Sequence, residues 1–108
     1  MTYIVREWKR LSRKFADVNG RACEATEEAK AAMLQEAQRG IRYSPLAVAK
    51  FDQAVELFME ARHLMSQLVE LHMKLFPDDQ KVFEVKAMVE TSAEMTESYR
   101  DRLHRDLD

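Results

Sequence analysis

The chain has 108 residues, of which 46% are hydrophobic and 33% charged, with a formal net charge of −2. Two glycines and two prolines are too few for a β architecture, because strands joined by tight turns need many more of them. The single cysteine, Cys23, excludes an internal disulfide framework. We therefore expect one all-α domain over residues 1–108.

The first predicted helix runs from about residue 2 to about residue 39. Asn19-Gly20 is a pair that often ends a helix, yet the apolar register passes through it unshifted. We favour one continuous helix that is weakened at Gly20 by about 1 kcal/mol relative to alanine, with a break at this pair as the alternative. The apolar face repeats at three- and four-residue spacing and comprises Ile4, Trp8, Leu11, Phe15, Val18, Ala22, Ala25, Ala29 and Ala32.

The second predicted helix spans residues 45–76. Ser44 supplies an N-cap and Pro45 a first helical residue, and Tyr43 and Val48 suit a hydrophobic staple. Two adjacent apolar seams indicate that this helix has two neighbours. The first seam is Phe51, Val55, Phe58, Arg62, Met65, Val69, His72 and Phe76, and the second is Ala54, Leu57, Ala61, Leu64, Leu68, Leu71 and Leu75.

The third predicted helix spans residues 79–106, because Pro77 stops the preceding helix and Asp78-Asp79 caps the next one. Its predicted seam is Val82, Val85, Val89, Ser92, Thr96, Tyr99 and Leu103, flanked by Met88 and Met95. Short connections favour three long antiparallel helices, in an up-down-up bundle with coiled-coil-like packing. So slender a bundle is expected to be oligomeric.

Charge is distributed unevenly along the chain. Residues 1–21 carry six bases and two acids, a balance of +4, and residues 77–108 carry nine acids and five bases, a balance of −4. This asymmetry predicts either internal pairing of the basic run with Asp78, Asp79 and Glu84, or two separate partner surfaces. The basic run consists of Arg6, Lys9, Arg10, Arg13 and Lys14, and a nucleic-acid-associated protein using this first helix is one alternative function. We nevertheless expect no nucleic acid partner, because the aromatic residues of the run continue the apolar face.

A second alternative is a carboxylate and histidine metal site. Glu60 and His63 have the Glu-x-x-His spacing of di-iron helical bundles, with Glu56 one turn earlier. All three lie opposite both apolar seams, so we predict a solvated polar face, no metal and no cofactor. Asp101 and His104 repeat the spacing on the third helix.

The sequence offers no familiar catalytic pattern, and we predict that the protein is not an enzyme. It lacks a glycine-rich phosphate loop and paired zinc cysteines. His72 and Arg62 fall within a seam, where hydrogen-bonded structural roles are favoured. Cys23 is expected to be an ordinary thiol at the edge of the bundle.

These features predict a small protein–protein interaction module, of an adaptor, chaperone-like or regulatory kind. It would bind an amphipathic helical partner, or a second copy as a homodimer, through an apolar groove. The predicted partner-binding residues are Trp8, Phe15, Met59 and Met73. No leader pattern opens the chain and no apolar run approaches the ~18 residues of a spanning helix, so we expect a cytoplasmic protein with no membrane partner.

Overall fold

The computed structural model describes residues 2–40 and 45–107, which form three α-helices and no strand. These are α1 (Thr2–Gln38), α2 (Pro45–Leu75) and α3 (Lys81–Leu107). The predicted all-α class and its three long helices are confirmed, with boundaries displaced by one or two residues. The predicted cap at Ser44 and the staple residue Tyr43 lie outside the described residues.

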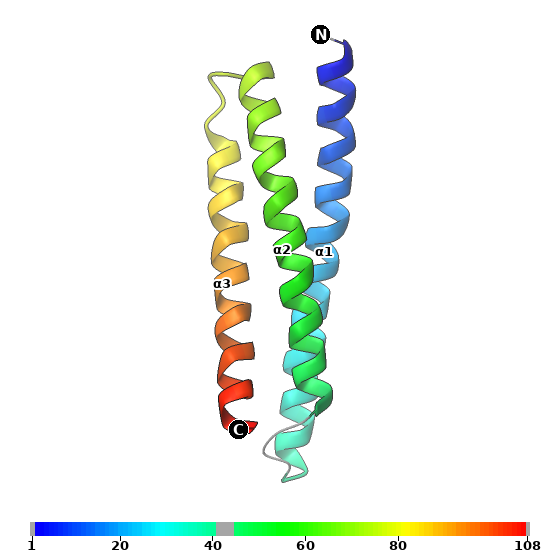
Figure 1. The fold of residues 1–108 in the computed structure, drawn as a ribbon, viewed down its shortest axis with the longest axis vertical. Helices are drawn as coiled ribbons and strands as arrows, with labels where there is room; N and C mark the ends of the chain where they lie inside the picture. The colour runs from blue at the N-terminus through cyan, green and yellow to red at the C-terminus, as the bar shows by residue number, and fades with distance from the viewer. Residues whose placement is uncertain (1, 41–44, 108) are drawn as a thin grey trace.

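The three helices pack side by side in a rod that measures 58 × 20 × 19 Å (Figure 1). In this view the chain descends along α1, returns along α2 and descends again along α3. Helix α2 packs against both α1 and α3, whereas the backbones of α1 and α3 approach each other closely at few points. The prediction that residues 45–76 form the central element is confirmed.

Helix α1 continues without interruption through Asn19 and Gly20. Gly20 is exposed, and a Cβ built on it would meet no atom within 4 Å. The favoured prediction of one long helix is therefore confirmed over the alternative of a break. At the far end, Gly40 has a φ of 79° and its N–H donates to the carbonyl of Ala37 at 3.1 Å, which is how glycine commonly ends a helix.

The predicted seams of α1 and α2 form the core. Phe51, Phe58 and Met65 are its largest fully buried side chains. Both α2 seams are buried over most of their length, as expected for a helix with two neighbours. The prediction is wrong for Phe76, which lies just past the end of α2 and is 44% exposed. The second half of α1 buries only small residues, which allow a close approach to α2: Ala22, Ala25, Thr26, Ala29 and Ala32.

The predicted seam of α3 is wrong at one position. Val82, Val89, Thr96 and Leu103 are buried, but Val85 is 42% exposed. The buried line instead takes in Ala93, which is fully buried. Val85 lies on an adjacent face of the helix, because α2 covers only one side of α3.

Candidate functional site

A second line of mostly apolar residues runs along α3 beside the buried one, and its lower part, where Tyr99 stacks on Phe51, faces α1. It comprises Val85, Met88, Ser92, Met95 and Tyr99, which we call the outer seam. Its spacing of three, four, three and four residues is that of a coiled-coil seam. Val85, Met88 and Met95 are 42%, 69% and 54% exposed. Aligned exposed apolar residues of this kind mark contact surfaces more often than scattered ones.

The lower part of the outer seam borders a pocket of about 150 Å³ between α1 and α3. Phe58 of α2 is one of its lining residues. The other lining residues are Cys23, Thr26, Glu27 and Lys30 of α1 and Ser92, Met95, Thr96 and Tyr99 of α3. The Lys30 ammonium lies 5.8 Å from the centre of the Tyr99 ring, and the Arg102 guanidinium lies 5.1 Å from it. Both distances suit a cation–π interaction. Cys23 is exposed, as predicted for an edge thiol.

Two buried threonines join α1 and α3 beside this pocket. The Thr26 hydroxyl donates to the Ala22 carbonyl at 3.0 Å, and the Thr96 hydroxyl donates to the Ser92 carbonyl at 2.9 Å. Their oxygens lie 3.4 Å apart. Since each hydroxyl has one proton and donates it to a backbone carbonyl, the two oxygens lie in contact without a hydrogen bond of their own.

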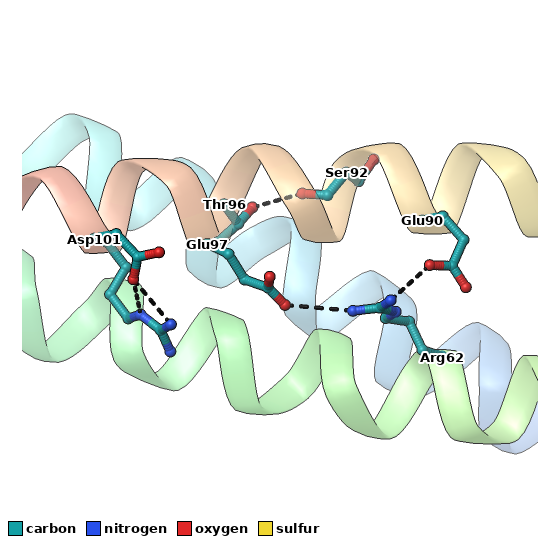
Figure 2. Close-up of polar contacts among 7 residues, drawn as sticks. Arg62, Glu90, Ser92, Thr96, Glu97 and Asp101 are labelled. Atoms are coloured by element: carbon teal, nitrogen blue, oxygen red, sulfur yellow. Dashed lines mark hydrogen bonds and ion pairs between the residues drawn. The ribbon is translucent and has the colours of Figure 1, made fainter.

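Arg62 anchors α3 to α2 from within the first seam. Its guanidinium lies 2.8 Å from a carboxylate oxygen of Glu90 and 3.4 Å from one of Glu97, between the two acids (Figure 2). All three side chains are about one-third exposed. The predicted structural role of Arg62, with its stem on the core and its head on carboxylates, is confirmed.

His72 joins all three helices at the opposite end of α2 from Pro45. Its Nδ1 lies 3.2 Å from the indole nitrogen of Trp8, and its Nε2 lies 3.0 Å from Asp79. The second Asp79 oxygen accepts the backbone N–H of Lys81 at 3.0 Å, so Asp79 caps the start of α3 as predicted. The Lys81 N–H, followed by the imidazole of His72, holds the pKa of the Asp79 carboxyl below its usual value. The predicted hydrogen-bonded structural role of His72 is confirmed.

The basic run forms an exposed stripe on the outside of α1. Its five residues, Arg6, Lys9, Arg10, Arg13 and Lys14, line one shallow surface depression. Arg10 pairs with Glu7 and lowers the pKa of that carboxyl. None of the ion pairs among the described residues joins the stripe to Asp78, Asp79 or Glu84, so the predicted internal pairing is not formed. The first turns of α1 and α3 lie on opposite sides of α2 (Figure 1).

The four predicted partner-binding residues have different surroundings. Met59 is exposed, whereas Trp8, Phe15 and Met73 are partly buried and pack against the main core cluster. Sequence reasoning missed the outer seam as a candidate surface, although the spacing of Met88 and Met95 with Val85, Ser92 and Tyr99 was the available signal.

The predicted metal residues lie on the solvent side of α2. Glu56, Glu60 and His63 are all exposed, as their position opposite the seams predicted. His63 bonds Gln67 at 3.2 Å, and His104 bonds Asp52 at 3.1 Å rather than Asp101. Across residues 2–40 and 45–107, no three histidine, cysteine or acidic side chains come together in an arrangement that would hold a metal ion.

No protein-family model, no curated protein and no solved structure matches this chain. No described helix has both the length and the apolar character needed to cross a bilayer.

Proposed function

We propose that this chain is a small helical interaction module, an antiparallel up-down-up bundle that assembles through the outer seam of α3. The exposure of Val85, Met88 and Met95 on one face of that helix is the observation that carries the proposal. Regular coiled-coil spacing suits this face to a second helix laid along it. A partner with the same spacing would cover the methionines, whose flexible side chains adapt readily to an apposed surface.

The partner that best fits the charges is a second copy of the chain. The basic stripe on α1 meets no acid of α3 within its own chain, and Glu84 and Glu94 have no ion-pair partner among the described residues. A second copy supplies both the matching apolar seam and the complementary charges. Complementary potentials of this kind guide association and fix its register.

Sedimentation velocity over a range of concentrations tests the proposal. We expect the wild-type protein to form a dimer, and the double variant Met88→Glu/Met95→Glu to be monomeric with unchanged helical circular dichroism. Leu34→Glu is the matched control, because Leu34 is an exposed apolar residue on α1 outside the seam. A wild-type protein that stays monomeric at every concentration refutes self-association, and dissociation by Leu34→Glu alone places the interface elsewhere.

Nucleic acid binding is a second candidate, favoured by the exposed basic stripe on α1. Its cations span two helical turns, and those other than Arg10 have no acidic partner among the described residues. Such a stripe can follow a phosphate backbone. We expect any binding of duplex DNA or RNA to weaken steeply with salt and to be lost in Arg6→Glu/Arg13→Glu, with Arg102→Glu on α3 as the control. Absence of binding at low salt eliminates this candidate.

A further inference from the structure

A continuous chain of hydrogen bonds crosses the end of the molecule where α2 gives way to α3. It runs from the Trp8 indole of α1, through both ring nitrogens of His72, to Asp79, and ends at the backbone N–H of Lys81. The rings of Trp8 and His72 also flank Phe76, with centroid distances of 5.6 and 5.0 Å. The His72 side chain is only 14% exposed. Each helix thus contributes one group to a single polar connection.

The protonation state of His72 follows from the chemistry of its partners. An indole N–H can only donate, so Nδ1 of His72 must carry a lone pair to accept it at 3.2 Å. The imidazole is therefore neutral, with its proton on Nε2, from which it donates to Asp79 at 3.0 Å. Protonation would place a second N–H on Nδ1, directed at the N–H of the indole. Two donors cannot form a hydrogen bond, so the contact with Trp8 would be lost.

The contact with Asp79 responds in the opposite way. Its Nε2–H donates in both states, and in the charged state the hydrogen bond becomes an ion pair. Protonation therefore weakens the connection to α1 and strengthens the one to the start of α3. We propose that His72 is a proton-operated latch, which holds the N-terminal turns of α1 when neutral and releases Trp8 when protonated.

Few charged groups lie near His72 to influence its protonation. On α1, the residues one turn from Trp8 are Ile4, Val5, Leu11 and Ser12, all uncharged. On α2, the residues one turn from His72 are Leu68, Val69 and Leu75, and Phe76 follows the end of the helix; these are also uncharged. From the turn before α3 the imidazole meets Asp79, which in turn interacts with Lys81. Glu7, the acid next to Trp8, is already paired with Arg10.

The latch does not depend on how the protein assembles. Trp8 is the first large apolar residue anchoring α1 to the core cluster, so its release would loosen the helix from its start to about Leu11. The alanine-lined half of α1 lies far from this end and would stay packed. The expected change is therefore local.

Fluorescence follows the latch directly, because Trp8 is the only tryptophan in the chain. Between pH 8 and pH 5 we expect the Trp8 emission to weaken and shift to the red in one single-proton transition, while helical circular dichroism stays constant. In His72→Asn the side-chain oxygen can still accept the indole N–H but does not titrate, so the transition should vanish. His63→Asn, which alters an exposed histidine of the same helix, should retain it.

Two further measurements keep the test decisive if His72→Asn folds poorly. In the wild-type protein, the NMR signal of the indole N–H should shift together with the ring nitrogens of His72 during acidification. Asp79→Asn should move the transition to lower pH, because a carboxylate favours the imidazolium. A Trp8 signal that does not change with pH, that changes without His72, or that persists in His72→Asn overturns the proposal.

Discussion

Replacing Gly20 with alanine should stabilise the protein, and the same change at Gly40 should destabilise it. Gly20 lies exposed in the interior of α1, with no atom within 4 Å of the Cβ it would gain. The substitution therefore adds no clash and buries no surface. Only the difference in helix propensity between glycine and alanine affects the free energy of unfolding. Alanine is favoured over glycine inside a helix by about 0.8–1.0 kcal/mol. An increase of this size in the free energy of unfolding raises the melting temperature of a domain near this length by about 4–8 °C.

Gly40, two residues past the end of the same helix, is the matched control. Its surroundings are equally open, but its φ is +79°, a region where a Cβ costs roughly 1–2 kcal/mol. Urea unfolding followed by circular dichroism, at one protein concentration for all variants, compares the two. We expect the free energy of unfolding to rise in Gly20→Ala and to fall in Gly40→Ala. Loss of stability in Gly20→Ala would refute a continuous α1, since it would mean that the native backbone at Gly20 is not helical.

Three further substitutions probe packing, ion pairing and the helix cap. Ala61→Leu should cost about 1–3 kcal/mol in urea unfolding, because Ala61 is fully buried and a core without free space resists added atoms; a neutral effect would mean a loosely packed core. Glu97→Gln should cost less than about 1 kcal/mol, since its contact with Arg62 is partly exposed and Glu90 remains as a partner; a double-mutant cycle with Arg62→Met measures the coupling. Asp79→Asn should lower the free energy of unfolding at neutral pH, because the depressed pKa of this carboxyl favours the folded state. The difference from wild type should disappear only in acid below that lowered pKa, where the carboxyl is protonated in both the folded and the unfolded protein. An equal loss in the free energy of unfolding of Asp79→Asn at neutral pH and in acid would contradict that last expectation.

The sequence predicted the helices well because their signals are local and repeated. Each predicted boundary lies within two residues of the observed one, and all predicted seam residues of α1 and α2 except Phe76 are buried or partly buried. Periodicity also predicted that the helix continues through Gly20. A loop at this position would have shifted the register of the apolar residues, and the register is unshifted. The exposure of His63 and the inward position of His72 followed from the same wheel positions.

The surface features were harder to predict because they depend on how far apart helices lie. Val85 belongs to an apolar series on the helical wheel, and only the distance between α1 and α3 shows that it is uncovered. The expected pairing of the basic run with Glu84 failed for the same reason, because it assumed adjacent first turns for α1 and α3. The links from His72 to Trp8 and Asp79 join elements whose relative positions no local pattern specifies.

The number of apolar seams supports the proposal that the partner is a second copy of the chain. Helix α1 carries one seam, α2 carries two, and α3 carries its buried line together with the outer seam. The two extensive contacts within the chain, of α2 with α1 and of α2 with α3, each use two seams. The exposed residues of the outer seam, Val85, Met88 and Met95, are thus left over, whereas Tyr99 stacks on Phe51 and the lower part of the seam borders α1 through the pocket at Thr26. A twofold-symmetric dimer pairs a surface with its own copy, so the proposed dimer would cover the remaining seam without requiring a second kind of protein.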